Sequence, residues 1–353
     1  MAITKLGSQL ARNLSLIAVF GCGYNIATAA SFTSTVFATG SAVNATQPDS
    51  ITIGNGSLWA EYSNGASSTN YTGTSTIVQY SLAGAVQNTY SIPGSADGLK
   101  YNPNTGQVWA LQNQDANSRL SLINPATGTV TTYNYGDPYP SISGSRGFDD
   151  VAFIGSNVYL SVTNPNAATD PVIVKLNNAT PTTPVTFTTV LTGTGLLATD
   201  PDSLKSTPTG GLILTGEGDG ALTFVTNPGM ATQTATSLKL SAAPGATIGS
   251  PDDALFATAD SGTFYIADTA TNTIYAIAAS GLTPNSLFVS TATAFGSVDQ
   301  TTGVVTPIIT GRSLHGMEFV PSAAAVPEPS TFGISLAGVA LGAVAVLRKC
   351  IAR

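Results

Sequence analysis

The stretch Ser261-Gly262-Thr263-Phe264-Tyr265-Ile266-Ala267-Asp268, followed by Asn272-Thr273-Ile274-Tyr275, contains the pattern that decides the fold. An apolar and aromatic run ends on Asp, a polar turn follows, and a second apolar run begins. Short runs of this composition, separated by turn residues, are typical of β-strands joined as a hairpin. The stretch therefore predicts an all-β body.

The same order recurs along the chain at intervals of roughly 50 residues. The expected first strands begin at Asp49-Ser50-Ile51, Asp97-Gly98-Leu99, Asp149-Asp150-Val151, Asp202-Ser203-Leu204 and Asp252-Asp253-Ala254, with a looser sixth copy at His315-Gly316-Met317. The expected second strands contain Leu58-Trp59-Ala60, Val108-Trp109-Ala110, Val158-Tyr159-Leu160, Leu212-Ile213-Leu214 and Phe264-Tyr265-Ile266. The agreement of both series indicates a true repeat.

A repeat of this length holds about four short strands, which is what one blade of a β-propeller needs. Third strands are expected at 76–82, 119–123, 172–176 and 273–277, and turns at 124–128 and 300–303 lead into fourth strands. A strand at 34–39 has no partner before it, so we expect it to complete the last blade and close the ring. Six blades are predicted, with seven as the alternative because 287–309 has room for more than one incomplete blade.

Composition supports this fold class and excludes several kinds of site. The chain has 353 residues, of which 42% are hydrophobic and 9% charged, with 36 Gly and 20 Pro. The two cysteines, Cys22 and Cys350, fall in terminal apolar segments. The body therefore has no disulfide, no Cys-based zinc site and no Cys nucleophile.

Charge argues against a nucleic-acid partner. The formal net charge is −7, and five of the 12 basic residues lie in the terminal segments, at Lys5, Arg12, Arg348, Lys349 and Arg353. The body alone is therefore distinctly acidic and repels phosphate backbones and anionic lipids.

Residues 1–29 have the three parts of a secretory signal peptide. Lys5 and Arg12 precede an apolar run at 14–20, and Ala27-Thr28-Ala29 supplies the small residues of a cleavage site after Ala29. The Sec translocon and signal peptidase are the expected partners. Two alternatives are a buried core helix and a lipoprotein signal at Cys22.

The C-terminal end is arranged like a membrane anchor. After the propeller body at 30–321 and a linker at 322–331, residues 332–347 are uncharged and apolar, and 348–353 form a basic tip. A helix of this length reaches about 24 Å, somewhat short of the ~30 Å hydrocarbon core. We expect it to span the membrane with the tip in the cytoplasm and the body outside.

The sequence Val326-Pro327-Glu328-Pro329-Ser330-Thr331, before a short apolar helix and a basic tip, resembles the PEP-CTERM sorting signal of exopolysaccharide-producing bacteria. The resemblance implies that an exosortase cuts near this motif and passes the body to the cell surface or extracellular matrix. Two prolines cannot continue a helix, so they keep the backbone extended where an enzyme can reach it. An ordinary tail anchor after a Pro-rich linker is the alternative.

The opening stretch also resembles an NHL-type propeller repeat, in which apolar residues, Ala-Asp, a polar turn with Asn and another strand follow each other. The other copies match loosely, with Ala60-Glu61 and Ala110-Leu111 at the Ala-Asp position. The resemblance supports the fold and implies little about activity.

The acids at the starts of the first strands are the candidate site of metal or ligand binding. We expect these acids near the mouth of the central channel, where a hard cation such as Ca2+ would relieve their repulsion; they are Asp97, Asp149, Asp150, Asp202, Asp252 and Asp253. Propeller hydrolases resembling gluconolactonase and calcium-dependent phosphotriesterase hold a metal there. The alternative is structural, since Asp side chains bond nearby backbone N–H groups at strand entries.

No catalytic residue is predicted. His315, the single histidine, stands in the loosest copy of the repeat, and we expect a turn residue without a partner. The segment Glu217-Gly218-Asp219-Gly220 is too short for an EF-hand.

Three functions are consistent with the sequence. The first is a non-enzymatic surface or matrix module that binds glycan or protein through loops such as 133–139, which is rich in Tyr and Asn. The second is a metal-dependent hydrolase of a lactone or ester. The third is an inert structural component of the exopolysaccharide layer.

Overall fold

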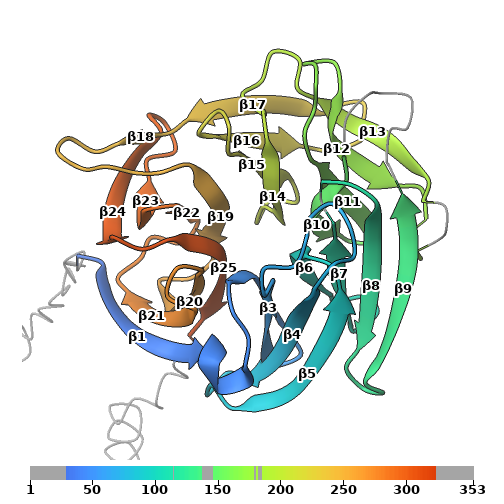
Figure 1. Cartoon of the computed structure of the whole chain (residues 1–353). Helices are drawn as coiled ribbons and strands as arrows, with labels where there is room; N and C mark the ends of the chain where they lie inside the picture. Colours follow the sequence, from blue (N-terminus) through green and yellow to red (C-terminus); the bar gives the residue numbers. More distant parts are fainter. Residues whose placement is uncertain (1–28, 114, 137–145, 179, 182–184, 323–353) are drawn as a thin grey trace, which may run out of the picture.

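The computed structural model describes residues 29–113, 115–136, 146–178, 180–181 and 185–322. These residues form six sheets arranged as a ring around a central channel (Figure 1). The prediction of an all-β, six-bladed propeller is confirmed, and the seven-bladed alternative is wrong. The stretch at 287–309 belongs to one blade.

The first four blades follow the chain in order, with antiparallel neighbours from the channel outward. Blade 1 contains β2 (Pro48–Gly54), β3 (Ser57–Tyr62), β4 (Thr74–Ser81) and β5 (Val86–Pro93), and blade 2 contains β6 (Ala96–Asn102), β7 (Gln107–Gln112), β8 (Ser118–Asn124) and β9 (Thr129–Gly136). Blade 3 contains β10 (Phe148–Ile154), β11 (Asn157–Val162), β12 (Pro171–Leu176) and β13 (Phe187–Thr192). Blade 4 contains β14 (Pro201–Ser206), β15 (Leu212–Gly216), β16 (Ala221–Thr226) and β17 (Thr234–Lys239).

The last two blades are interleaved. Blade 5 runs outward through β19 (Pro251–Ala257), β22 (Ser286–Thr291), β23 (Ala294–Val298) and β24 (Val304–Thr310), with the short β18 (Ser241–Ala242) parallel at its edge. Blade 6 runs through β25 (Leu314–Pro321), β20 (Ser261–Asp268), β21 (Thr273–Ser280) and β1 (Ser31–Thr39). The chain thus leaves blade 5 after one strand, builds a hairpin in blade 6, and returns.

This exchange corrects one prediction. The second strand containing Phe264-Tyr265-Ile266 pairs with β25, not with the first strand that begins at Asp252. A strand pattern specifies an extended, half-buried segment but not the neighbour with which it pairs. The Phe264 ring, fully buried, instead packs against Phe288 and Phe295 of blade 5, with ring centroids 4.6 and 5.1 Å away. That aromatic contact locks the two blades together.

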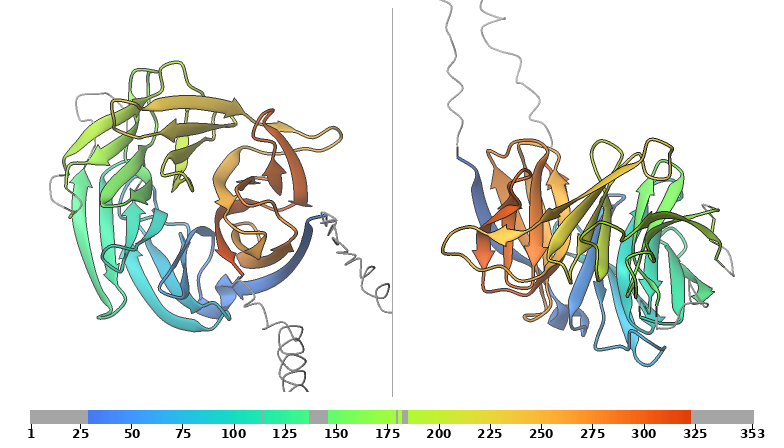
Figure 2. Two further views of the ribbon diagram at one scale, coloured as in Figure 1. Left: turned by 180° about the vertical axis from the view of Figure 1, so that it is seen from behind. Right: turned by 90° about the horizontal axis from the view of Figure 1, so that it is seen from above.

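The ring closes through the N-terminal strand, as predicted for residues 34–39. Strand β1 pairs antiparallel with β21 on the outer rim of blade 6, where the two lie side by side (Figure 2). Phe37 of β1 packs edge-on against Tyr265 and Tyr80, at centroid distances of 4.9 and 5.7 Å. Because Tyr80 belongs to blade 1, this strand also joins the last blade to the first.

The core lies between neighbouring blades. One cluster, for example, combines Trp59 and Ile77 of blade 1 with Leu99 and Val108 of blade 2. Burial between sheets of this kind stabilises the fold without a disulfide.

The one element outside the blades that the structure describes is a short turn. This 3-10 turn, η1 (Gly40–Val43), directly follows β1.

Part of the expected ligand-binding loop is not a loop. Residues 133–136 end strand β9, and the Tyr135 side chain is 3% exposed because it packs against Phe148. It cannot stack on a ligand. Residues 137–139 lie outside the described part of the chain.

Most of the predicted signals lie outside the described residues. These include 1–28 with Ala27, the sorting motif from Val326 to Thr331, and the apolar segment 332–347. Ala29 is exposed two residues before β1. Among the residues that are described, no helix has the length and apolar character to cross a membrane.

Candidate functional site

Six innermost strands surround the channel, namely β2, β6, β10, β14, β19 and β25, and neighbouring ones contact each other around the ring. The second residue of each strand is acidic in five blades and histidine in the sixth. We call these six residues the mouth ring: Asp49, Asp97, Asp149, Asp202, Asp252 and His315. Four of the six expected site residues belong to it.

A bulge explains how these side chains reach the channel. In β2 the pairing with β3 jumps from Pro48 to Ile51, and the same jump over two residues recurs at the start of β6, β10, β14 and β25. Strand β19 has a register shift at the same place, from Pro251 to Asp253. A bulge re-aims the side chains of the unpaired residues and bends the strand. The repeated Asp-x dipeptide therefore occupies a repeated irregularity of the backbone.

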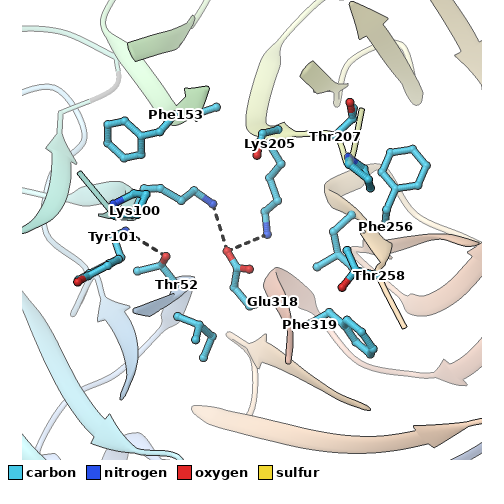
Figure 3. A pocket seen from close by; sticks show the side chains of 16 residues that line it. Thr52, Lys100, Tyr101, Phe153, Lys205, Thr207, Phe256, Thr258, Glu318 and Phe319 are labelled. Atoms are coloured by element: carbon cyan, nitrogen blue, oxygen red, sulfur yellow. Dashed lines mark hydrogen bonds and ion pairs between the residues drawn. The ribbon is translucent and has the colours of Figure 1, made fainter. Parts of the chain in front are cut away.

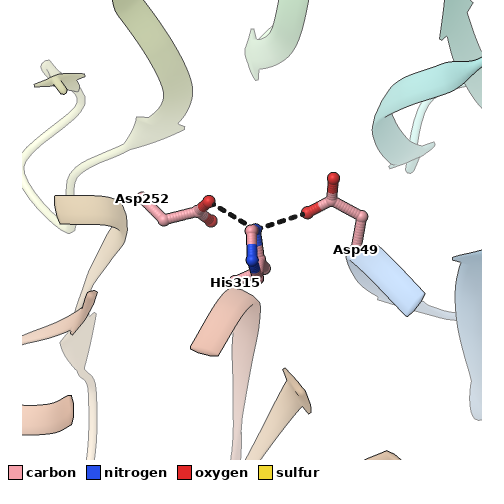
Figure 4. Close-up of side chains that lie close together, drawn as sticks. All are labelled: Asp49, Asp252 and His315. Atoms are coloured by element: carbon pink, nitrogen blue, oxygen red, sulfur yellow. Dashed lines mark ion pairs between the residues drawn. The ribbon is translucent and has the colours of Figure 1, made fainter. Parts of the chain in front are cut away.

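His315 lies between two carboxylates and is not a partnerless turn residue, so that prediction is wrong. Its Nδ1 is 2.7 Å from Asp252 Oδ2 and 3.2 Å from Asp49 Oδ1 (Figure 4). Burial alone would lower the pKa of His315, but Asp252 and Asp49 outweigh burial and raise this pKa to about 12. The imidazole is therefore protonated at neutral pH and supplies the ring's one internal positive charge.

The remaining carboxyl groups of the ring hold protons more tightly than usual. Burial, and then repulsion by other ring aspartates, raises the pKa of Asp97, Asp149 and Asp202 well above its ordinary value. Burial also raises the pKa of Asp252 to about 6, although His315 acts in the opposite direction. The five closely spaced carboxyl groups thus carry more potential negative charge than one imidazolium compensates.

The other two expected site residues, Asp150 and Asp253, have a structural role. Asp150 accepts hydrogen bonds from the N–H groups of Val151, at 2.7 Å, and of Leu204 in the next blade, at 2.9 Å. Asp253 accepts equivalent bonds from Ala254 and from Met317 of the next blade, both at 2.7 Å. Each aspartate joins adjacent inner strands, which is the arrangement that the structural alternative expects.

Sequence reasoning missed Asp49 as a site residue, although a signal was present. Asp49-Ser50-Ile51 matches Asp202-Ser203-Leu204 in the repeat alignment. Because Asp49 stands at the same position of its repeat as Asp202, the repeat pattern alone predicts Asp49 as a member of the candidate site.

Sequence reasoning also missed Glu61, because this residue lies on the second strand of its blade, β3, and not at the start of an inner strand. It is fully buried on β3 beside the bulge of β2, and neither carboxylate oxygen has a hydrogen-bond partner within the described residues. Burial, followed by Asp49 and Asp97, raises the pKa of Glu61 well above normal. Three other blades place a hydroxyl here that bonds the bulge backbone of the same blade, at Ser161, Thr215 and Ser290.

The donor set of the mouth ring fits a divalent cation. Asp49, Asp252 and His315 each offer one ligand atom, and these atoms lie within 4.8 Å of one another. Carboxylate oxygens suit Ca2+, whereas imidazole nitrogen suits transition metals and must first lose its proton. Asp49 and Asp252 are thus the residues that would hold a hard cation, which would take the place of the His315 imidazolium between them. The other ring aspartates are near enough to contribute charge.

The sequence matches no protein-family model and no curated protein. Among solved structures, a streptogramin B lyase is 14% identical with a TM-score of 0.44, over 84% of this chain and 74% of that one. A putative gluconolactonase is 10% identical with a TM-score of 0.47, over 80% and 83%. A calcium-binding protein, regucalcin from Agrobacterium tumefaciens, is 13% identical with a TM-score of 0.45, over 77% and 75%. Likenesses this distant carry nothing about activity.

Proposed function

We propose that this protein is an exported binding propeller whose channel mouth holds a divalent cation, with Ca2+ as the first candidate. One observation carries the proposal: the same position of all six inner strands is occupied by Asp or His, on a bulge that repeats from blade to blade. A merely structural Asp would bond the backbone, as Asp150 and Asp253 do. In the mouth ring, by contrast, Asp97 interacts with Asp149, and Asp49 and Asp252 lie on either side of His315.

Electrostatics supports the same conclusion. The raised pKa values of Asp97, Asp149 and Asp202 mean that their charged forms lack compensation. A bound cation would stabilise those charged forms and relieve the repulsion among them. The cation would neutralise the negative charge of the mouth ring and would offer a coordination site to a binding partner that carries oxygen atoms.

Titration calorimetry with Ca2+ near neutral pH tests the proposal. We expect binding by the full-length protein and an affinity at least about tenfold weaker for Asp49→Asn and Asp252→Asn, since each removes a charged ligand. Asp260→Asn is the matched control, because Asp260 is exposed in the turn after β19, at the strand's other end. Absence of both heat and thermal stabilisation at millimolar Ca2+ would overturn the proposal.

A metal-dependent hydrolase is the second candidate. The observation that favours it is the position of Asp202 in the mouth ring, where burial raises its pKa and so makes the carboxyl group a better acceptor of a proton than an ordinary aspartate. Hydrolysis of a lactone by the Ca2+-loaded protein, lost in Asp202→Asn while Ca2+ binding persists, would favour this candidate over simple binding.

Export and sorting complete the proposal. The signal-like residues 1–29 and the Pro327-Glu328-Pro329 motif support secretion, transient anchoring and exosortase processing. Pro321 pairs with Gly262, and Ser31 pairs with Ser280, so the described chain enters and leaves blade 6 at the same end. His315 lies at the other end of β25. An anchored body would therefore present the mouth ring away from the membrane.

Mass spectrometry of the protein recovered from the producing cells tests the processing route. We expect a mature N-terminus at Ala30 and loss of everything after the Pro-Glu-Pro motif, because both flanking segments serve as addresses. A C-terminus still ending at Arg353 would leave only a plain membrane anchor.

A further inference from the structure

The end of the channel opposite the mouth ring opens into a cavity of about 370 Å3, which we call the distal cavity (Figure 3). The fifth residue of each inner strand lines it, in the order Thr52, Lys100, Ala152, Lys205, Leu255 and Glu318. Residues after these strands form the rim: Pro103, Thr207, Pro208 and Thr258. Nothing in the mouth ring contributes to this lining.

The charges of the distal cavity balance one another. Glu318 Oε1 is 3.2 Å from Lys100 Nζ and 3.6 Å from Lys205 Nζ, and Lys205 also lies 2.6 Å from Asp253 Oδ2. Burial would raise the pKa of Glu318, but the two lysines outweigh burial and lower it. Burial would lower the pKa of Lys100, but nearby carboxylates, Glu318 first, raise it. Carboxylates within the protein, namely Glu318, Asp253 and Asp150, therefore compensate the positive charge of both lysines, which disfavours a simple anion as the ligand, and the lysines themselves disfavour a cation.

Hydrogen-bonding capacity remains on these groups. Both lysines contact the same oxygen of Glu318, its Oε1. The other carboxylate oxygen, Oε2, accepts no hydrogen bond from any described residue. Lys100 donates to Glu318 alone within the described chain, which leaves two of its three N–H groups free. Thr52 Oγ1 accepts a bond from Tyr101 N at 3.1 Å and still has its own proton to donate. Donors and an acceptor thus stand side by side.

Hydroxyl groups match such an arrangement, because each one both donates and accepts. Ala152 and Leu255 alternate with the polar residues around the wall and offer surface to C–H groups. A cavity of about 370 Å3 has room for a molecule of the size of one sugar unit. The volume is also within the usual range of small-molecule sites.

We propose that the distal cavity binds a neutral sugar unit, which enters from the end of the channel opposite the mouth ring. Lys100, Glu318 and Thr52 bond its hydroxyl groups, and Leu255 and Ala152 contact its apolar edges. This site is independent of the cation site, since the two sets of residues lie three positions apart on every inner strand.

Saturation-transfer NMR with the full-length protein tests this site, using glucose, galactose, mannose and N-acetylglucosamine at about 10 mM each, followed by calorimetry for any sugar that responds. A chelator present throughout separates the outcome from that of the Ca2+ experiment. We expect at least one of these sugars to bind, and glucuronate and glucosamine to bind more weakly, because each brings an uncompensated charge.

The double variant Lys100→Met with Glu318→Gln removes one positive and one negative charge, so the balance is kept while the hydrogen-bonding groups change. We expect it to remain folded, because Lys205 keeps its closer partner Asp253, and to bind the sugar at least about tenfold more weakly. Lys239→Met removes an exposed lysine of β17 and is expected to bind normally. The proposal would be overturned by a signal from none of the four sugars, by tighter binding of glucuronate, or by unchanged sugar binding in the double variant. Unchanged binding in the double variant would mean that the ion pairs of the distal cavity have only a structural role.

Discussion

Raising the pH from about 5 to about 9 is expected to lower the thermal unfolding temperature of the metal-free protein by at least about 10 °C. The reason is that buried carboxyl groups at the channel mouth bind protons more tightly in the folded state than in the unfolded state. Asp97, Asp149, Asp202 and the buried Glu61 all have a pKa raised well above its ordinary value. Unfolded carboxyl groups lose their protons near pH ~4. Between that pH and their raised folded pKa, these groups hold more protons in the folded state, so stability falls as pH rises.

The other titrating groups act in the same direction or outside this window. For Asp252, a pKa shift from 3.8 to about 6 corresponds to about 3 kcal/mol, lost as pH rises through that interval. His315, with its pKa raised to about 12, contributes stability that is complete below its unfolded pKa and is lost as pH rises toward 12. Glu318 has a lowered pKa, so its contribution is lost only below its ordinary value.

Thermal melts by circular dichroism at constant ionic strength, with chelator present, measure this effect. Asp149→Asn is expected to flatten the curve, since it removes a raised carboxyl group, while Asp260→Asn is expected to leave it unchanged. Addition of Ca2+ at high pH should restore part of the lost stability. A melting temperature that rises from about pH 5 to about pH 9 would contradict the electrostatic description of the ring.

Replacing Asp253 by Ala is expected to destabilise the protein by about 3–5 kcal/mol, because it removes one partner of a buried ion pair. The side chains of Asp253 and Lys205 are 3% and 9% exposed, and their charged atoms lie 2.6 Å apart. The same carboxylate accepts the N–H groups of Ala254 and Met317, at 2.7 Å each. The substitution therefore leaves a buried ammonium group with one carboxylate fewer and two backbone donors without their acceptor.

Urea unfolding compared through the transition midpoint, at unchanged slope, measures this loss. Asp253→Asn is expected to be nearly as harmful, since an amide supplies neither the charge nor a second acceptor oxygen. The matched control is Asp202→Asn in the mouth ring, which we expect to be neutral or stabilising because the charged form of Asp202 is disfavoured. If Asp253→Asn and Asp202→Asn lowered the free energy of unfolding equally, the aspartates of the mouth ring and those that bond the backbone would not differ in their effect on stability.

Much of the fold could be predicted from residue patterns alone. Runs such as Ser261–Asp268 are strands in the structure with the bounds that the sequence suggests, and the strand at 34–39 closes the ring. The acids at the strand starts, such as Asp97 and Asp202, could also be placed at the channel mouth. These features are local: alternation, turn residues and the period of the repeat are properties of consecutive residues.

Partner choice could not be predicted in this way. Strand β20 leaves the blade of β19 and pairs with β25, because an apolar strand packs equally well against any neighbour of matching pattern. The tertiary contact of Phe264 with Phe288 and Phe295 decides between the two arrangements. Likewise, the predicted loop at 133–139 begins as part of an outer strand, with Tyr135 buried by its tertiary neighbours.

The sequence by itself therefore determined an all-β ring of six repeats with an acidic residue at the start of five inner strands. Only the tertiary structure decided what each acid does. Asp252 and Asp253 are adjacent in the chain, yet Asp252 contacts the His315 side chain at the channel mouth and Asp253 accepts a backbone N–H group of the next blade. Successive side chains of a strand point to opposite sides, and a bulge re-aims them, so their surroundings come from residues far away in the sequence. For the same reason, no local pattern announced the distal cavity, whose lining comes from six separate strands.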